Sequence, residues 1–281
     1  MKIYYVDGQF VESDKAMIPV DDLSILRGFG VFDIMRTFNH KPYLINEHIQ
    51  RLLNSATGIG LSLPWSKKDL IQIVLQTLGK NNLSCEANIR IIITGGSSTD
   101  FFYPQGKPRL IILVTDMNQL PDTWYTNGVK VITRYQERTL PDAKVISYVA
   151  AAMALQEAEK QNAIEAIYVN RKKQVMEGTT SNLFAIFNGI LITPKVGVLK
   201  GITRQAVITL SKNICTIKEK PIKLEDLLKA DEVFLTGTNK GVIPVIQVDD
   251  TIIGNGIVGE KTIQIMKVLN RHSQNFIDSS K

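Results

Sequence analysis

Residues 174–184 carry a lone carboxylate into a segment that otherwise has the composition of a tight turn. They read QVMEGTTSNLF, so Glu177 is followed by glycine, three small hydroxyl residues and Asn182 before an apolar run begins. A turn requires glycine and asparagine, but it does not require an acidic side chain at its entrance. We therefore interpret Glu177 as a candidate functional acid, beside which small residues let the backbone approach a ligand.

Lys144 is the candidate nucleophile. It stands in LPDAKVISYVAAA, directly before an alanine-rich segment. A lysine among small apolar residues loses part of its hydration, which lowers its pKa and suits Schiff-base chemistry. Glu177 supplies the complement, because an acid that faces a pyridinium nitrogen keeps it protonated, and the protonated ring withdraws electrons from a substrate carbanion. A lysine that merely begins a helix is the alternative explanation.

Three further stretches are candidates for binding a phosphate. KGITRQAV (200–207) places Gly201, Ile202 and Thr203 at a predicted helix N-terminus, where free backbone N–H groups and the helix dipole favour an anion. FLTGTNKG is a second loop of this kind, after a predicted strand. Arg51 lies beside the apolar stripe of EHIQRLL, from which its guanidinium can reach inward. The ordinary alternatives are a simple Thr203 N-cap, a strand-ending turn and a solvated arginine.

The composition is that of a globular protein with ample core. The chain has 281 residues, 44% hydrophobic and 21% charged, which fits one large or two medium domains. MKIYYVDGQF does not resemble a signal peptide, and no window of about 20 apolar residues predicts a membrane span. Cys85 and Cys215 lack CxxC spacing and the three histidines lack ligand spacing, which indicates neither disulfides nor a metal site. The sequence therefore predicts a cytoplasmic protein.

The net charge of +6 does not by itself predict a nucleic-acid partner. The basic residues are scattered, and the densest run, RKK at 171–173, lies between two strand-like segments as a hairpin turn. A basic surface equally attracts anionic small molecules.

The first part of the chain reads as an α+β unit. Apolar runs flank the Asp7-Gly8 dipeptide, which is a hairpin signal, and the glycines of SILRGFGVFDIMRTF interrupt a strand-like run. Asn46 is the expected cap of one helix, and Ser66 with Asp69 resembles a capping box that opens a second. NIRIIITGG and PRLIILVTD read as two buried strands.

The second part follows a polar linker at 116–128. The predicted strands are VKVITRY, EAIYVN, NLFAIF, ILIT, EVFLTG and VIPVIQVDD. Helices are expected from about Ser147, from Thr203, in LEDLLKA and from about Gly259. We therefore predict two α+β domains, a smaller one at 1–118 and a larger one at 119–281 that carries Lys144, with a cleft between them.

Taken in order, these segments resemble a known family. The motifs are RGFGVFDIMRT, NEHIQRL, NIRIIITGG, DAKVISYVAAAMALQEA, EAIYVNRKKQVMEGTTSNLF, LKGITRQAV and ADEVFLTGTNKGVIPV. They are similar to those of the fold-type IV pyridoxal-phosphate enzymes, namely branched-chain aminotransferases, D-amino acid aminotransferases and aminodeoxychorismate lyases. The resemblance covers nearly the whole chain. It implies the two-domain D-amino acid aminotransferase-like fold, pyridoxal 5'-phosphate in the interdomain cleft, and a homodimer with the active site near the interface.

The resemblance also assigns roles. Lys144 forms the Schiff base with the cofactor and transfers protons, Glu177 pairs with the pyridine nitrogen, and Tyr148 lies near the ring hydroxyl. Ser181 and Asn182 complete the loop around Glu177. The residues that the resemblance places at the phosphate are Arg51, Gly201, Ile202, Thr203 and Thr238.

Two departures separate the chain from parts of this family. D-amino acid enzymes carry a carboxylate-binding arginine where this chain has Gly95, and no histidine follows in SSTDFF. Lyases show Thr-Thr where this chain has Asp33-Ile34, so the hydroxyl proposed to assist lyase chemistry is absent.

Two arginines favour the branched-chain type. Arg36 in FDIMR resembles the arginine of that type's FEGIR, and Arg90 in NIRI resembles the carboxylate-binding arginine of its YIRP. Phe32, with its apolar neighbours, is expected either to wall an aliphatic pocket or to be ordinary core. Asn239 and Lys240 stand where small residues normally meet the substrate carboxylate, so Lys240 is a candidate to supply positive charge there.

We expect transamination between a branched-chain-like amino acid and a 2-oxo acid. The alternative is a 4-amino-4-deoxychorismate lyase that forms 4-aminobenzoate and pyruvate. A catalytically idle cofactor-binding protein is a remote third possibility, against which the intact Lys144 and Glu177 pair argues. The expected partners are small-molecule substrates, without nucleic acid, membrane or metal.

Overall fold

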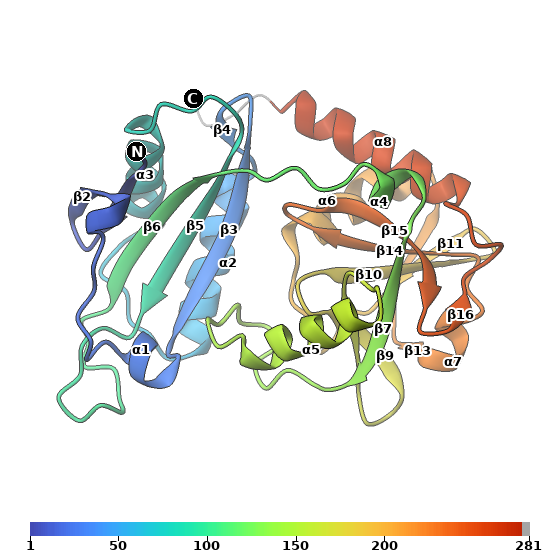
Figure 1. Ribbon diagram of the computed structural model, residues 1–281, viewed down its shortest axis with the longest axis horizontal. Helices are drawn as coiled ribbons and strands as arrows, with labels where there is room; N and C mark the ends of the chain where they lie inside the picture. The colour runs from blue at the N-terminus through green and yellow to red at the C-terminus, as the bar shows by residue number, and fades with distance from the viewer. Residues whose placement is uncertain (277–281) are drawn as a thin grey trace. The chain divides into compact units, whose positions relative to one another are not determined.

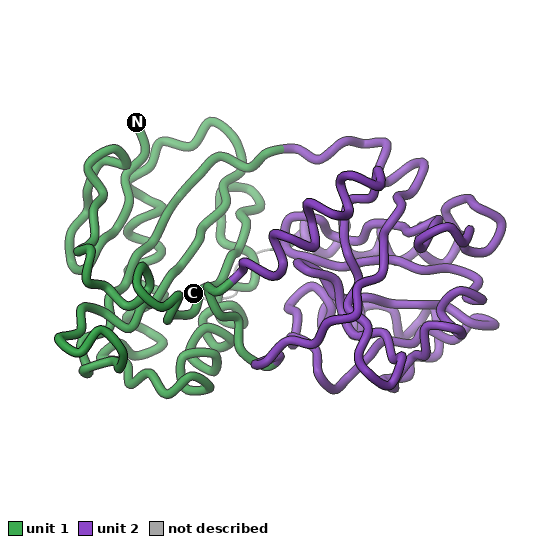
Figure 2. The backbone as a smooth tube through the Cα atoms, turned by 60° about the horizontal axis from the view of Figure 1, so that its bottom comes forward, with its two compact units in different colours: residues 1–118, 142–147, 276–281 green, residues 119–141, 148–275 purple. Residues whose placement is uncertain are grey.

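The computed structural model describes residues 1–276, whose contacts form two compact units (Figure 2). Unit 1 contains residues 1–118, 142–147 and 276, and unit 2 contains residues 119–141 and 148–275. Each unit has its own β-sheet and helices, as the α+β fold class requires (Figure 1). No helix within the described residues is long and apolar enough to cross a membrane.

Unit 1 is built on a six-stranded antiparallel sheet with the strand order β2-β1-β6-β5-β3-β4. Its strands are β1 (Ile3–Val6), β2 (Gln9–Glu12), β3 (Gly30–Phe38), β4 (Lys41–Pro42), β5 (Ala87–Thr94) and β6 (Arg109–Asp116). The predicted hairpin at Asp7-Gly8 is confirmed. Both turn residues have positive φ, as a two-residue hairpin loop of this type needs.

The helical segments of unit 1 are η1 (Ser13–Lys15), α1 (Leu23–Arg27), α2 (Ile45–Gly58) and α3 (Lys67–Gly79). The predicted capping box opens α3, with Ser66 accepting from the Asp69 N–H and Asp69 accepting from the Ser66 N–H. The predicted Asn46 cap is wrong, because α2 begins at Ile45 after Leu44, which has left-handed backbone and makes no side-chain cap. Gly28 ends α1 in the left-handed conformation and so does not interrupt a strand.

Alternation along β3 directs its residues to two faces of the sheet. Odd-numbered residues such as Val31 and Met35 are fully buried in the core formed with α2 and α3. Helix α2 contributes a buried stripe of Ile49, Leu52 and Ala56 to the same core. Because Asp33 shares this parity, its carboxylate is directed toward α2 and is fully buried.

Residues 142–147 lie along the edge of β3. The Phe32 N–H donates to the Lys144 carbonyl at 2.9 Å, and the Ile146 N–H donates to the Gly30 carbonyl at 3.1 Å. Glycine is needed at position 30, since a Cβ there would lie 2.7 Å from the Ile93 carbonyl oxygen. This pairing groups Lys144 with unit 1, whereas the sequence analysis expects it in the C-terminal domain at 119–281.

Unit 2 is built on a ten-stranded sheet, whose main path is β12-β11-β10-β14-β15-β7-β8-β9-β13. Its strands are β7 (Val129–Tyr135), β8 (Ala166–Val169), β9 (Gln174–Gly178), β10 (Asn182–Phe187), β11 (Ile190–Thr193), β12 (Thr216–Glu219), β13 (Ile222–Lys223), β14 (Glu232–Gly237), β15 (Gly241–Val248) and β16 (Thr251–Ile252). The turns predicted at 171–173 and at Asn188-Gly189 are confirmed.

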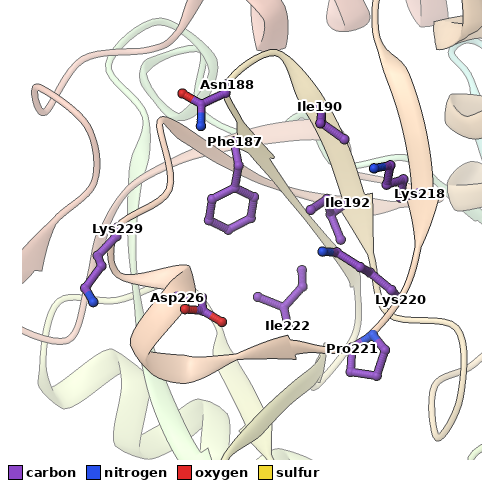
Figure 3. Close-up of a pocket in the computed structure, with 10 residues that line it drawn as sticks. All are labelled: Phe187, Asn188, Ile190, Ile192, Lys218, Lys220, Pro221, Ile222, Asp226 and Lys229. Carbon is purple, nitrogen blue, oxygen red and sulfur yellow. The ribbon is translucent and has the colours of Figure 1, made fainter.

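The two end strands of this path, β12 and β13, are consecutive in the chain and are joined only by Lys220 and Pro221. These two strands are not paired with each other, and beside them lies a surface hollow of about 310 Å³ (Figure 3). Phe187, Ile192 and Ile222 are apolar residues that line it, and the last two also belong to a hydrophobic core of unit 2.

The helical segments of unit 2 are α4 (Thr123–Thr126), α5 (Val149–Lys160), α6 (Ile202–Leu210), η2 (Ser211–Asn213), α7 (Leu224–Leu227) and α8 (Glu260–Gln274). Helices α6 and α8 contribute Val207, Ile265 and Leu269 to a core on the other face of β10 and β14. The alanine-rich helix begins at Val149, two residues after the expected start. Gly201 is the N-cap of α6, so Thr203 is not an N-cap.

Candidate active site

A buried ionic cluster connects β3 to α2 in unit 1. Asp33 accepts 2.8 Å hydrogen bonds from both Nε and Nη2 of Arg51 and lies 2.7 Å from His48 Nδ1. Burial raises the pKa of the Asp33 carboxyl, but the charges and hydrogen bonds of Arg51 and His48 outweigh it and hold the pKa well below its ordinary value. Arg51 is therefore a buried, oriented side chain and not a solvated arginine.

His48 is neutral in this cluster. Its burial lowers the imidazole pKa below the ordinary value, and the nearby positive charges of Arg51 and Lys144 act in the same direction against the attraction of Asp33. A neutral ring with its proton on Nδ1 donates to Asp33. Asp33 and His48 are buried partners of the predicted site residue Arg51 that the sequence analysis did not select.

Lys144 is held by its backbone on two sides. Its N–H donates to the Ser55 hydroxyl at 3.1 Å, Ser55 donates in turn to the Arg51 carbonyl at 2.8 Å, and the Lys144 carbonyl accepts from Phe32. The Lys144 ammonium lies 4.5 Å from the centre of the Phe32 ring. Its main chain is therefore fixed relative to α2 and β3, which restricts the positions that Nζ can occupy.

Arg90 shares the Phe32 ring with Lys144, because its guanidinium lies 5.5 Å from the ring centre. Arg36 lies on the same face of the sheet, two residues beyond Ile34, the partner of Arg90 in the β3–β5 register. The structure therefore brings together three predicted substrate residues, Phe32, Arg36 and Arg90, with Lys144 beside the aromatic ring.

Gly95 is closely surrounded in unit 1. A Cβ at this position would lie 3.0 Å from Leu23 Cδ1 and 3.2 Å from Phe29 Cδ1. A side chain here therefore requires Leu23 and Phe29 to shift by a few tenths of an ångström.

Glu177 is a buried carboxylate with three donors in unit 2. Arg138 Nη1 donates to Oε1 at 2.9 Å, while Asn182 Nδ2 at 3.2 Å and the Leu199 N–H at 2.9 Å donate to Oε2. The donors satisfy the buried carboxylate with hydrogen bonds, and the guanidinium adds a compensating positive charge. Arg138 lies 39 residues before Glu177, so no local spacing in the sequence connects the two residues.

Asn182 connects Glu177 to the N-terminus of α6. Its Nδ2 also donates to the Leu199 carbonyl at 2.9 Å, and its Oδ1 lies against Gly201, where an added Cβ would approach to 1.9 Å. The N-cap residue of α6 is Gly201, which has no side chain to cap the helix. The first N–H groups of α6, at Ile202 and Thr203, are therefore suited to binding an anion.

Two hydroxyl groups near this region have no hydrogen-bond partner among residues 1–276. They are Oγ1 of Thr179, which follows the Glu177-Gly178 pair, and Oγ1 of Thr236, which is paired in register with Asn182. Buried hydroxyls usually have partners, so these groups fit a ligand with polar atoms. Thr238 lies half-buried in the turn that follows β14, and Asn239 beside it is exposed. The residues therefore fit a phosphorylated cofactor with an acid beside its ring.

Lys240 has a partner that the sequence analysis did not anticipate. Its ammonium pairs with Oε2 of the fully buried Glu165, and it also donates to Thr180 Oγ1 at 2.7 Å. Ser181 donates to the same Glu165 oxygen at 3.1 Å. The Lys240 ammonium is therefore paired with a buried carboxylate in unit 2, whereas the sequence analysis expects it at the substrate carboxylate. Tyr148 is half-buried and precedes the first residue of α5.

The chain matches other protein sequences over most of its length. Residues 30–248 match the family model described as amino-transferase class IV. A provisionally named branched-chain-amino-acid aminotransferase of Methanocaldococcus jannaschii is 36% identical over 272 residues, 93% of each chain. A D-alanine aminotransferase of Listeria monocytogenes is 32% identical over 268 residues, 92% of each chain.

Solved structures give the same result. The branched-chain aminotransferase of Escherichia coli is 26% identical with a TM-score of 0.91, and the match covers 99% of this chain and 97% of that one. The branched-chain aminotransferase of Thermoproteus uzoniensis is 28% identical with a TM-score of 0.89, covering 97% and 95%. The predicted fold type is confirmed, and the chain is an enzyme that belongs to the class IV aminotransferase family.

Proposed function

We propose that this enzyme binds pyridoxal 5'-phosphate and transfers the amino group of a branched-chain L-amino acid to a 2-oxo acid. Class IV aminotransferases use this cofactor, and another similar structure, also a branched-chain amino acid aminotransferase, contains pyridoxamine 5'-phosphate. That structure is 25% identical to this chain with a TM-score of 0.90, covering 97% and 94% of the two chains.

The observation that carries the proposal is the buried Glu177 carboxylate with its three donors. Such an acid has a strong partner in a protonated ring nitrogen and keeps that nitrogen protonated. When bound, pyridoxal phosphate supplies an electron-withdrawing ring that stabilises the charge left at the substrate Cα after proton loss. The proposed role of Glu177 is therefore to keep the ring nitrogen protonated, the state in which the ring withdraws electrons.

Lys144 is the proposed base and attachment point. Its Nζ would hold the cofactor, and its free amine would serve as the base for the proton of the substrate Cα. The fixed backbone around Lys144 limits the positions that Nζ can occupy, which favours proton transfer at one atom. Tyr148 is the proposed partner of the ring hydroxyl.

The proposed phosphate ligands include the N-terminus of α6. Gly201 permits close approach there, and the backbone N–H groups of Ile202 and Thr203 supply donors with the positive end of the helix dipole. Arg51 and Thr238 are the remaining proposed ligands. Ser181 and Asn182 act at the loop around Glu177, Ser181 through Glu165 and Asn182 directly.

A branched-chain donor is supported by the residues around Phe32. Arg90 and Arg36 place two guanidinium groups on its face of the sheet, which suits a substrate carboxylate, and the ring offers apolar surface to an aliphatic side chain. Asn239 is a further proposed substrate contact. Position 95, where a D-amino acid enzyme is expected to carry an arginine, is glycine in this chain. In place of the lyase hydroxyl, Asp33 carries a carboxylate that is engaged by Arg51.

We further propose a cytoplasmic homodimer. Free Cys85 and Cys215 suit a reducing compartment, and the resemblance to dimeric enzymes supports two copies. Light scattering of the purified protein tests the proposed dimer, and a measured mass corresponding to one chain contradicts it.

The test of the proposed function is a visible absorption spectrum of the purified enzyme with pyridoxal phosphate, recorded before and after addition of an amino acid. We expect a band that L-leucine bleaches and D-alanine, added to a separate sample, does not. Lys144→Ala serves as the control and should lack the band. Bleaching by D-alanine alone contradicts the proposed donor, bleaching by neither favours the lyase, and absence of any band contradicts cofactor binding.

A further inference from the structure

Glu165 and Lys240 form a buried ion pair in unit 2 that the transamination chemistry does not use. The Glu165 side chain is fully buried, and that of Lys240 is 17% exposed. The two residues come from different parts of the chain, since Glu165 precedes β8 and Lys240 lies in the turn between β14 and β15. A buried carboxylate requires a nearby positive charge, and Lys240 supplies it.

On one side, the pair holds the loop that follows Glu177. Glu165 Oε2 accepts hydrogen bonds from Thr180 Oγ1 at 2.9 Å and from Ser181 Oγ at 3.1 Å. Gly178 packs directly on this acid, since a Cβ at position 178 would lie 3.0 Å from Glu165 Cγ. Glu177 stands at the start of this loop and Asn182 at its end, and the Asn182 amide donates a hydrogen bond to the Glu177 carboxylate.

On the other side, the pair holds the turn that contains Thr238 and Asn239. The Lys240 N–H donates to the Gly237 carbonyl at 3.2 Å, and the Lys240 carbonyl accepts from Tyr125 Oη at 3.0 Å. The Lys240 ammonium also donates a hydrogen bond to Thr180 Oγ1 at 2.7 Å. One side chain therefore links two loops that both carry proposed cofactor or substrate contacts.

We propose that Lys240 is a positioning residue whose ammonium, through Glu165 and Thr180, fixes the loop that presents Glu177 to the cofactor. Its charge serves this loop and does not bind the substrate carboxylate. The proposal rests on the proposed function, because it concerns the same bound cofactor. The chemistry of Glu177 then depends on a residue that does not touch it.

The test uses the full-length variants Lys240→Met, Glu165→Gln and the double variant. Lys240→Met leaves a buried charge without its counter-ion, so the loop shifts and the dissociation constant of pyridoxal phosphate should rise on the order of tenfold or more. The double variant removes both charges and keeps a hydrogen-bonding amide at 165, so its dissociation constant should return to within about threefold of wild type. Absorbance titration of the apoenzyme measures these constants.

Two further readouts separate positioning from substrate binding and from general stability. The visible band of the bound cofactor should shift in Lys240→Met, because the environment of the ring nitrogen changes, whereas the KM for the 2-oxo acid at saturating cofactor should change less than about twofold. Lys223→Met, at an exposed surface lysine, is the matched control. A KM that rises while cofactor affinity and band stay unchanged overturns the proposal, and so does a double variant that is no better than Lys240→Met.

Failure of the proposed function has a different signature. If wild-type protein shows no cofactor band, thermal unfolding of the apoprotein still tests the ion pair. Lys240→Met should then unfold at a lower temperature, and the double variant should recover most of the loss. If the double variant recovers thermal stability but wild type shows no cofactor band, the ion pair still holds the loop and only the cofactor proposal is contradicted. If the double variant does not recover stability, the proposed role of the ion pair is overturned.

Discussion

At the residue scale, the charge of Asp33 fixes the side chain of Arg51 in unit 1. It is fully buried, and its two oxygens receive hydrogen bonds from Arg51 and His48. The arrangement fixes the guanidinium in one orientation, whereas the guanidinium of a surface arginine moves among many orientations. Asp33 supplies the counter-charge of Arg51, which supports the proposal that Arg51 is a preoriented phosphate ligand.

Asp33→Asn should destabilise the protein by about 3 to 5 kcal/mol, because it leaves the buried Arg51 guanidinium without this carboxylate. Urea unfolding at pH 7 measures the change. Asp14→Asn, at an exposed residue of η1, is the control and should change stability by less than about 0.5 kcal/mol. Equal effects of the two substitutions contradict the role assigned to Asp33.

The cluster also predicts how stability depends on pH. The pKa of His48 is lower in the folded protein than its ordinary value of 6.5, so below that pH the unfolded chain binds the proton more readily. Stability should therefore fall as pH decreases from 7 to 5, with a slope of up to about 1.4 kcal/mol per pH unit from this group. Asp33 acts in the same direction below its ordinary range, because its folded pKa is also lowered.

His48→Gln tests this statement, since glutamine does not titrate. Urea unfolding at pH 5, 6 and 7 should give a flatter dependence for the variant than for wild type. Parallel curves for the two proteins contradict a neutral, buried His48.

At the element scale, the start of α6 combines a glycine N-cap with close packing. Gly201 lies against Asn182 Oδ1, and Asn182 in turn bonds to Glu177. The helix proposed to supply phosphate donors is therefore coupled to the acid proposed to face the ring. The packing at Gly201 makes this coupling sensitive to a single methyl group.

Gly201→Ala should weaken pyridoxal phosphate binding on the order of tenfold, because a Cβ at this position would lie 1.9 Å from Asn182 Oδ1 and must displace it. Titration of the apoenzyme measures the dissociation constant. Gly79→Ala at the end of α3 is the control, since a Cβ there meets nothing within 4 Å among the described residues, and it should leave binding unchanged. Unchanged affinity in Gly201→Ala contradicts the proposed phosphate site.

At the scale of the whole molecule, the chain leaves unit 1 after residue 118 and returns to it at 142–147. The return places Lys144 beside α2 and β3, while the rest of the second half builds unit 2. The position of Lys144, the proposed attachment point of the cofactor, is thus decided by backbone pairing with a strand more than 100 residues earlier.

Ile146→Pro tests this pairing in the full-length protein, because proline has no N–H to donate to the Gly30 carbonyl. Hydrogen exchange at the Phe32 amide, which bonds to Lys144, should become up to about tenfold faster. Exchange at amides of β10 in unit 2 should stay unchanged and is the internal control. Unaltered exchange at Phe32 indicates that the segment is held by other contacts.

The sequence by itself determined the family and most of the elements. Hairpins at Asp7-Gly8 and Asn188-Gly189 and the Ser66–Asp69 capping box were predictable, because each depends on residues within four positions of one another. The errors at Asn46 and Thr203 concern helix starts, where one residue of shift changes the cap. The roles assigned to the site residues rest on the resemblance and remain predictions.

Only the tertiary structure decided which side chains pair. Arg138 reaches Glu177, Arg51 reaches Asp33, and Lys240 reaches Glu165 across separations of 39, 18 and 75 residues. Nothing in local spacing encodes such pairs, because they form only when strands and helices distant in the chain become neighbours. The physical reason is burial, since a charge removed from water must find its partner wherever the fold places one.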